Sequence, residues 1–393
     1  MGSLKRKVLI AFKKNEAKIY NEVIFYKTLK MQKLVLVIII LFGNICLVYS
    51  QNKTSIFRDS TDNALDLSHF LTKKKGVLPL IVPITEPAVG YGAIVAGLFF
   101  VPSKKQKKQP DIIAAAAGLT SNGTWLVGGG YIGFWNEDKI RYRGAVGYGD
   151  INLEYYGISS KPVSITLNTF LFLQQLNFRL GKSNFFLGAK YQLAKVIIPI
   201  FKDSELIDPI DLKSVNSGIS VIAEFDNLNN FLSPTKGVRV HLSYDQNLEV
   251  LGSTRDWGKI NFFTHIYYPV NKLWIPALRL ESKFATGKPP FYAKPFVSLR
   301  GVPALRYQGD FTMLAETEQL FNITHRWGIV GFTGIGAAFD YIDNMESDEL
   351  VWNAGAGFRY LIARALGVKM GVDIARGPED WAFYVTLGTA WMK

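Results

Sequence analysis

Residues 237–245 read GVRVHLSYD, and this stretch decides the fold class. Apolar side chains fall at every second position with polar or charged ones between them, which is the period of a β-strand with one apolar and one polar face. The same period recurs in four further segments, 272–284, 351–361, 367–375 and 383–391. From about residue 86 onward, the chain therefore consists of successive antiparallel strands.

Two architectures share this pattern, a soluble β-sandwich and an outer-membrane β-barrel. Segments of roughly ten residues repeat with no change in composition that marks a domain boundary, which is typical of membrane barrels. Aromatic residues gather at the ends of the predicted strands, where a barrel carries its interfacial girdles. These residues are Phe99, Phe100, Trp135, Tyr267, Tyr268, Trp274, Trp327, Trp352 and Trp391. We therefore predict an all-β fold, a transmembrane antiparallel β-barrel that pairs its own backbone groups inside lipid.

The pattern gives sixteen strands. They are placed at 87–101, 111–121, 124–135, 139–148, 151–158, 163–180, 184–200, 215–226, 237–248, 256–268, 271–286, 311–324, 326–339, 351–361, 366–376 and 381–392. An even number puts both ends of the barrel on one side of the membrane. The weakest predictions are the strand at 151–158 and the split at Gly149-Asp150, and fourteen strands remain if that pair of strands is lost.

Connection lengths predict which side each connection faces. The short turns 121–123 and 324–325 are expected on the periplasmic side, together with the C-terminus. The longer connections 202–214, 287–310 and 340–350 are expected outside, because outer-membrane barrels have short periplasmic turns and longer outer loops.

The first residues have the features of a targeting segment. An apolar run at 34–42 follows Met31 and Lys33, which is typical of a secretory signal peptide over 31–50; a membrane anchor is the alternative, although the run is short for one. Residues 1–30 are expected to be an upstream extension, 51–85 a short periplasmic segment and 86–393 the barrel.

Composition excludes several classes of protein. The chain has 393 residues, 48% of them apolar, and one Cys, which excludes an internal disulfide framework and a Cys-rich metal site. Its formal charge is +13, but residues 1–50 carry nine basic and two acidic residues, so +7 lies there and +6 remains. Without the targeting segment, the charge gives little support for nucleic-acid binding, and we predict none.

Motifs in the second half resemble the outer-membrane BamA/TamA superfamily of β-barrels, also called bacterial surface antigens. LRGVPALRYQG at 299–309 is similar to the family's Arg-Gly motif in a loop that folds back into the lumen. DNLNNFLSPTKG, from Asp226 through Pro234 to Gly237, resembles its Asp-rich segment before a strand. WGIVGFTGIG at 327–336 resembles the family's strand with Phe332 and Gly336. Together these matches cover about 226–393.

The resemblance has departures. Many members carry Phe-x-Asp-x-Gly, whereas Gly334 stands at the acidic place here, so the loop Arg needs another partner. Segment 51–85 is too short for a POTRA domain, and the chain has no Gly-x-Ser-x-Gly motif of a patatin-like enzyme. The resemblance therefore implies a stand-alone barrel without POTRA domains.

Arg300, followed by Gly301, is the sharpest candidate site residue. A guanidinium in the lumen needs carboxylate partners, because an unpaired buried charge is costly. Strand parity points Glu316, Glu318 and Asp373 inward, and we expect Glu318 and Asp373 to hold Arg300 in a loop lock. The alternative is an arginine in a solvated loop.

Other candidate sites are weaker. His241 and His265 have inward parity on adjacent strands, and with Asp245 they form a possible metal or acid–base site, although wetted lumen histidines are the plainer interpretation. Residues 128–133 match Gly-x-Gly-x-x-Gly, but no helix follows, so a nucleotide loop is not predicted. No catalytic, cofactor or metal residues are predicted.

A cluster of lysines offers a partner site. Lys104, Lys105, Lys107 and Lys108 are expected in the first outer loop, where they would bind lipopolysaccharide phosphates or be simply solvated. Outer-membrane lipid and client membrane proteins are the expected partners.

Two classes of function remain. The resemblance implies an integral protein of the bacterial outer membrane that assists the insertion or translocation of proteins or lipids without catalysis. The alternative is a barrel-embedded lipase or protease, for which the sequence shows no cluster of nucleophile, base and orienting group.

Overall fold

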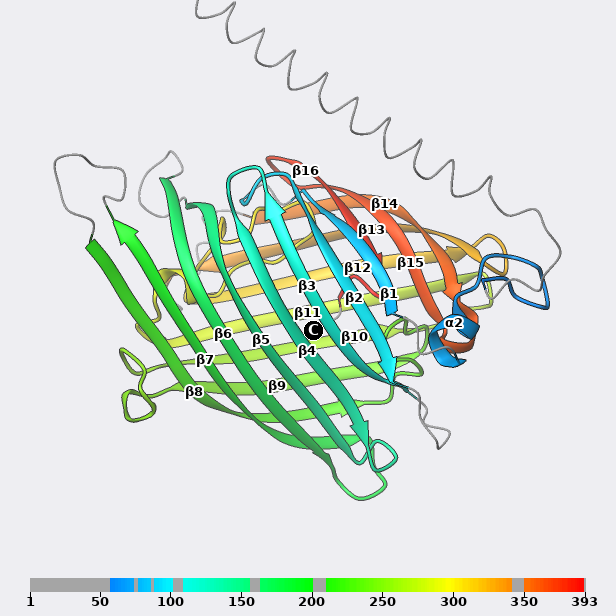
Figure 1. The fold of residues 1–393 in the computed structure, drawn as a ribbon, viewed down its shortest axis with the longest axis horizontal. Helices are drawn as coiled ribbons and strands as arrows, with labels where there is room; N and C mark the ends of the chain where they lie inside the picture. The colour runs from blue at the N-terminus through cyan, green and yellow to red at the C-terminus, as the bar shows by residue number, and fades with distance from the viewer. Residues whose placement is uncertain are drawn as a thin grey trace, which may run out of the picture. The chain divides into compact units, whose positions relative to one another are not determined.

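The structure is a computed structural model that describes residues 57–73, 77–85, 88–101, 109–155, 163–200, 210–340 and 350–391. The predicted upstream extension 1–30 and signal peptide 31–50 lie outside the described residues. Sixteen strands form one sheet in chain order, and every neighbouring pair is antiparallel (Figure 1). The predicted all-β barrel is confirmed.

The strands are β1 (Val77–Ile84), β2 (Gly92–Val101), β3 (Asp111–Thr120), β4 (Trp125–Trp135), β5 (Ile140–Tyr155), β6 (Val163–Arg179), β7 (Phe185–Ile200), β8 (Ile210–Asp226), β9 (Gly237–Asn247), β10 (Trp257–Tyr267), β11 (Trp274–Gly287), β12 (Phe311–Asn322), β13 (Trp327–Phe339), β14 (Leu350–Ala363), β15 (Val368–Arg376) and β16 (Trp381–Leu387). In the described part of the chain, one α-helix, α2 (Ser68–Lys73), precedes them, and three short 3-10 helices lie at η1 (Glu249–Leu251), η2 (Phe291–Ala293) and η3 (Arg364–Leu366).

The number of strands agrees with the prediction because two errors compensate. The prediction missed β1, so the barrel begins at Val77 rather than at residue 86. Pro79 and Pro83 make this segment look unlike a strand in the sequence, because proline within a sheet is found mainly in edge strands. Conversely, the predicted strands 139–148 and 151–158 are the single strand β5. Asp150 does not start a turn there, because Trp125 Nε1 (3.0 Å) and Asn168 Nδ2 (2.7 Å) donate to its carboxylate from the neighbouring strands.

The missed strand also reverses the side assigned to the early connections. We call the end of the barrel with loop 288–310 the loop end, and the end with residues 388–391 the tail end. Because strands alternate in direction, turn 121–124 lies at the loop end, opposite turn 323–326, so its predicted placement is wrong.

Lys104, Lys105, Lys107 and Lys108 lie outside the described residues. Their flanking strand ends, Val101 and Asp111, are at the tail end. The strand order therefore does not support placing these lysines on the same side as loop 288–310.

The two faces of the sheet invert the arrangement of a soluble protein. Apolar side chains cover the outside, such as Val221 (68% exposed) and Ile335 (53%). Charged side chains line the inside, where Asp373 is fully buried and Arg279 and Glu281 are nearly so. Such an outer surface is suited to lipid, and the charged lumen must satisfy itself by pairing. No helix in the described part of the chain is long and apolar enough to cross a membrane.

A seam separates the first and last strands, which lie next to each other (Figure 1). No backbone ladder joins β1 to β16 among the described residues, whereas each of the other neighbouring pairs has one. The Thr85 hydroxyl bridges the gap, donating to the Phe383 carbonyl (2.6 Å) and accepting from the Phe383 amide (2.7 Å). A side chain here takes the place of backbone pairing.

The last residues turn into the lumen instead of continuing β16. Gly388 has a φ of +85°, which glycine adopts without the strain of a side chain. The Thr389 amide then donates to the Leu232 carbonyl (2.7 Å), and Trp391 is buried. The predicted strand 381–392 is therefore too long, and Trp391 does not belong to the outer aromatic girdle.

The segment before β1 docks at the tail end. Helix α2 begins at Ser68. Leu71 is fully buried in an apolar cluster with Leu78, Phe100 and Val368, so the segment packs against strands from both ends of the sheet.

Candidate functional site

The loop that connects β11 to β12 folds back on itself and into the barrel. The Val297 amide donates to the Tyr307 carbonyl (3.0 Å), which joins the two arms of the loop. Val297 and Leu299 are buried against Leu314 of β12 and Val351 of β14. This apolar contact carries the next residue, Arg300, into the charged lumen.

Arg300 lies among three carboxylates on the inner wall. Its Nε donates to Glu316 Oε1 (3.0 Å), and its Nη1 donates to Glu318 Oε2 (3.0 Å) and Asp373 Oδ2 (2.8 Å). The guanidinium carbon lies 3.4 Å from the centre of the Phe332 ring, a close cation–π contact. The structure thus brings together the predicted Arg300, Glu318, Asp373 and Phe332, with Glu316 as a further partner.

Glu316 is shared by groups from both ends of the barrel. Its Oε1 accepts from Arg300 and from Asn353 Nδ2 (3.1 Å). Its Oε2 accepts from Trp391 Nε1 (2.6 Å) and Arg279 Nη1 (3.3 Å). Loop and tail therefore meet at one buried carboxylate. The sequence offered no signal for Trp391, because its alternation placed that residue on a lipid-facing strand.

Two glycines make this arrangement possible. Gly301 has a φ of +81°, and a Cβ there would lie 2.9 Å from the Gly377 amide nitrogen in the β15–β16 turn. Gly334 pairs with Glu316 across strands, and a Cβ there would lie 2.9 Å from Asn353 Oδ1. The acid expected on β13 is thus replaced by Glu316 on the adjacent strand, and Gly334 leaves room for it.

The Asp-rich segment forms the connection between β8 and β9 at the tail end. Asp226 accepts from Arg141 Nη1 (2.5 Å) and from the Leu228 amide (3.0 Å), so it fixes the start of the segment. Gly237 has a φ of +113° and ends it. Asn230 Nδ2 donates to the Leu366 carbonyl (2.9 Å), which ties the segment to η3 on the far side of the lumen.

Residues 138–302 match the Omp85 superfamily domain. This stretch of the chain is therefore similar to the Omp85 superfamily domain. The match runs from the β4–β5 turn to the loop that carries Arg300 and Gly301, and it includes the Asp-rich segment. The expected resemblance is confirmed, although the carboxylate partners of Arg300 lie beyond the matched residues.

Three solved structures share the fold. BamA from Haemophilus ducreyi lacking POTRA domains 1–3 aligns with a TM-score of 0.51 and 13% identity, over 84% of this chain and 79% of that one. CdiB from Escherichia coli aligns with a TM-score of 0.55 and 10% identity, over 78% of this chain and 61% of that one. CdiB from Acinetobacter baumannii gives 0.55 and 9%, over 79% and 59%. No curated protein matches this chain in sequence.

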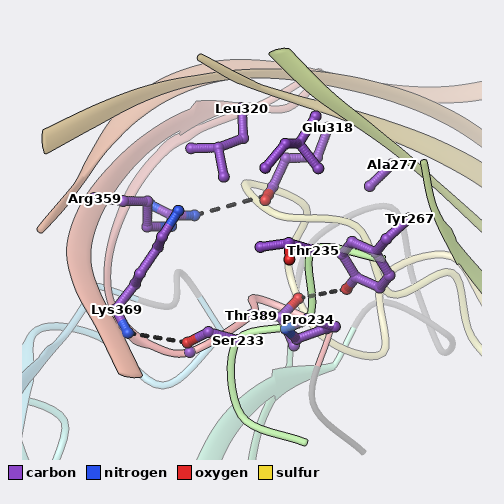
Figure 2. Close-up of a pocket in the computed structure, with 12 residues that line it drawn as sticks. Ser233, Pro234, Thr235, Tyr267, Ala277, Glu318, Leu320, Arg359, Lys369 and Thr389 are labelled. Atoms are coloured by element: carbon purple, nitrogen blue, oxygen red, sulfur yellow. Dashed lines mark hydrogen bonds and ion pairs between the residues drawn. The ribbon is translucent and has the colours of Figure 1, made fainter. Parts of the chain in front are cut away.

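A hollow lies on the tail side of the Arg300 cluster in this barrel (Figure 2). Its walls include Pro234 of the Asp-rich segment, Thr389 of the tail, and Glu318 and Lys369 of the barrel. Arg359, above Lys369 in Figure 2, donates to both oxygens of Asp373 (2.5 and 3.0 Å). The Arg300 cluster thus continues into the hollow through Asp373.

Two other residues singled out in the sequence, Gly336 and His241, pack against neighbouring side chains. Gly336 faces the loop, and a Cβ there would lie 2.6 Å from Val297 Cγ1, so this glycine admits the loop. His241 Nδ1 lies 3.1 Å from Glu224 Oε2, and its ring stacks on Phe263, which in turn stacks on His265. No group of metal-ligating side chains occurs among the described residues.

A second arginine cluster at the tail end escaped the sequence analysis. Arg326, in the β12–β13 turn, donates from Nη2 to Asp59 (2.5 Å), from Nε to Asp62 (2.7 Å) and from Nη1 to Asp66 (2.6 Å). Arg364 also donates to Asp59.

These hydrogen bonds shift the acidity of the groups involved. A hydrogen bond from Arg364 holds the pKa of Asp59 below its ordinary value, and one from Arg326 does the same for Asp62. The pKa of Arg326 is raised in turn, chiefly by Asp62. The only signal in the sequence is the spacing of the three Asp residues at i, i+3 and i+7, which is that of one helix face, although helix α2 begins only at Ser68.

Proposed function

We propose that this chain is an integral barrel of the bacterial outer membrane, of the BamA/TamA type, which assists the insertion or translocation of proteins or lipids without catalysis. The Omp85 match and the apolar outer face of the barrel support this proposal. Expected partners are outer-membrane lipid and client membrane proteins, and nucleic acid is not among them.

The observation that carries the proposal is the seam between β1 and β16. A strand edge without a ladder in lipid is costly, because its backbone groups have no water to bind. Such an edge is also a template for another strand. Pro79 and Pro83 further lower the number of donors on β1. Among the described residues no backbone ladder joins β1 to β16, so these two strands can part sideways into lipid at a lower cost than any of the paired strands.

The lengths of the connections support one orientation of the barrel. Connections at the tail end, such as 136–139, 323–326 and 364–367, are short, and loop 288–310 at the other end is long. We therefore place the loop end outside the cell and the tail end, with Trp391, in the periplasm.

A disulfide across the seam tests the proposal. Thr85 and Phe383 would each be replaced by Cys in a Cys46→Ser background, and the purified protein reconstituted in liposomes. The assay is the rate at which a urea-unfolded, eight-stranded outer-membrane protein inserts into those liposomes. We expect the oxidised variant to fall to the rate of protein-free liposomes and the reduced variant to recover.

Each single-Cys variant serves as a control, because one cysteine cannot cross-link the seam under oxidising conditions. A parallel assay of fluorescent-lipid exchange between leaflets separates protein insertion from lipid transfer. If the oxidised variant is as active as the reduced one in both assays, the seam is not the route, and this function is wrong.

A further inference from the structure

A row of polar side chains crosses the inner wall of the barrel toward the loop end. Lys190 of β7 pairs with Ser220 of β8, Ser220 pairs with Asp245 of β9, and Asp245 pairs with Lys259 of β10. Adjacent strands lie about 4.8 Å apart, so the four residues follow one another directly across the wall. Lys283 of β11 is the diagonal neighbour of Lys259, because Ala285 lies opposite Lys259.

Positive charge exceeds negative charge among these groups. Lys190 Nζ lies 2.9 Å from Asp245 Oδ1, and Lys283 Nζ lies 2.6 Å from Glu281 Oε1. Glu281 also accepts from Arg279 Nη2 (2.7 Å), so its charge is already shared between two cations. Lys259 has no hydrogen bond or ion pair to any residue that the structure describes. The three lysines therefore face the lumen with only two carboxylates beside them, Asp245 and Glu281, and Arg279 shares the second.

A buried amide lies beside this excess charge. Asn247 is on the inner face of β9, two residues from Asp245 and diagonal to Lys259. It is 0% exposed, yet neither its Nδ2 nor its Oδ1 has a hydrogen-bond partner among the described residues. A buried amide with both ends unsatisfied is unusual and indicates a missing polar partner.

The cluster remains within reach of a ligand. The side chains of Lys190 and Lys283 are 15% and 17% exposed. The Phe296 ring of the folded-back loop lies 5.1 Å from Lys283 Nζ, so the loop forms a roof next to the cluster. A small ligand here would be held between the wall and this loop.

We propose that this part of the wall, Lys190, Lys259 and Lys283 with the amide of Asn247, is a binding site for a phosphoryl group. Lysine binds phosphate as a point charge, and the amide nitrogen supplies an additional donor. Excess positive charge excludes a metal cation. The phosphoryl group is either that of free phosphate or that of a lipid headgroup. The site is independent of the seam and of the proposed insertion function.

Binding of inorganic phosphate to the detergent-solubilised full chain tests this proposal, measured by calorimetry at constant ionic strength with chloride as the reference anion. We expect saturable binding that Lys259→Gln weakens about tenfold, since a hydrogen bond to a charged group contributes about 1.5–3 kcal/mol. Lys259→Arg should retain most of the affinity. Lys182→Gln, at an exposed lysine in the turn at the tail end, is the matched control and should bind normally.

The same titration in nanodiscs identifies the source of the phosphoryl group. If phosphatidic acid at the same ionic strength abolishes phosphate binding and phosphatidylcholine does not, the site holds a lipid headgroup. If neither lipid competes, it holds free phosphate. Binding that is equally weak in all variants, or that Lys182→Gln lowers as much as Lys259→Gln does, would overturn the proposal. Heat-modifiable migration on gels shows whether each variant is a folded barrel.

Discussion

Arg300 and Arg326 are each held by three carboxylates, and they differ in what those carboxylates are attached to. Arg300 reaches from a loop to Glu316, Glu318 and Asp373, which belong to strands of the wall. Arg326 belongs to a turn of the wall, and its partners Asp59, Asp62 and Asp66 lie on the segment before β1. The two arginines are almost equally buried: Arg300 is 8% exposed and Arg326 is 7% exposed.

The comparison separates the strength of a contact from its consequences. Removing Arg300 leaves three carboxylates together on strands that cannot move apart without breaking the sheet. Removing Arg326 leaves three carboxylates on a segment that can swing into water, where each is solvated. We therefore expect the loss of Arg300 to lower the stability of the whole barrel strongly. The loss of Arg326, despite its similar geometry, should affect only the docking of the segment before β1.

The largest effect is expected for Arg300→Ala. Loss of one partner from a buried ionic group costs about 3–5 kcal/mol, and Arg279 and Arg359, which also contact Glu316 and Asp373, offset only part of the lost pairing. Arg300→Lys should recover only part of this, because one ammonium cannot reach Glu316, Glu318 and Asp373 in the geometry of the guanidinium fork. The temperature of the heat-modifiable gel shift and urea unfolding in detergent measure both changes.

Arg306→Ala is the matched control for this prediction. Arg306 lies in the same loop, and its Nε is 3.3 Å from Glu379, but its side chain is 29% exposed, so we expect a loss of less than about 1 kcal/mol. Asp373→Ala combined with Arg300→Ala should add little to Arg300→Ala alone. Full additivity of the two would show that Arg300 and Asp373 do not act as one unit.

The next largest effect is expected for Trp391→Phe, which extends the Arg300 cluster to the tail. The phenylalanine keeps most of the packing against Tyr267 but removes the indole donor to Glu316. We expect a loss of about 2 kcal/mol, measured by the same unfolding assays. Trp327→Phe, on the lipid-facing side, is the control and should change stability much less. Equal losses in both variants would mean that ring size, not the hydrogen bond, stabilises the tail.

How far the sequence predicts these two clusters depends on whether their residues obey a strand period. Glu318 and Asp373 could be predicted as inward-facing because parity fixes the face of every strand residue. Arg300 needed the family motif, because a loop has no period. Asp59 and Trp391 could not be predicted: the first lies in an irregular segment, and the second follows Gly388, whose positive φ ends the alternation.

The fold itself was predictable to the same extent. The alternation gave the barrel and most of its strands, but local turn and proline signals misled it at β1 and β5. Pro79 and Pro83 are tolerated because β1 is an edge strand at the seam, and Asp150 is tolerated because neighbouring side chains donate to it. Both exceptions depend on contacts with other strands, which one-dimensional patterns do not contain.

A local effect is expected for Arg326→Gln. The segment 57–73 should lose its main charged contact with the barrel while the strands stay paired. Limited chymotrypsin digestion of the folded protein, followed by mass spectrometry, should show cleavage in this segment roughly tenfold faster, whereas the heat-modifiable shift stays unchanged. Arg58→Gln is the control, because that guanidinium donates to the Asn63 carbonyl within the same segment (3.0 Å). A lowered heat-modifiable shift in Arg326→Gln would contradict the distinction between the two clusters.

The smallest expected effect is a pH dependence of the docking of segment 57–73 at the tail end. Hydrogen bonds from Arg364 and Arg326 lower the pKa values of Asp59 and Asp62. Burial acts to raise the pKa of Asp66, but hydrogen bonds from Ser68 and Arg326 outweigh it, so that this pKa is also lowered. A carboxyl whose pKa is lower in the folded state contributes its full stabilisation above its ordinary pKa and loses it as the pH falls through the folded value.

The docking of the segment should therefore be constant from neutral pH down to about pH 4, the ordinary range of aspartate, and weaken only below it. A nitroxide attached at Ser60→Cys, in a Cys46→Ser background, reports the mobility of the segment by electron paramagnetic resonance. We expect mobility to rise only in this acidic range. In Arg364→Gln the rise should begin at a higher pH, because Asp59 loses the hydrogen bond that chiefly lowers its pKa. A rise between pH 7 and pH 5 in the otherwise unchanged chain would mean that a group other than these three carboxylates controls the docking.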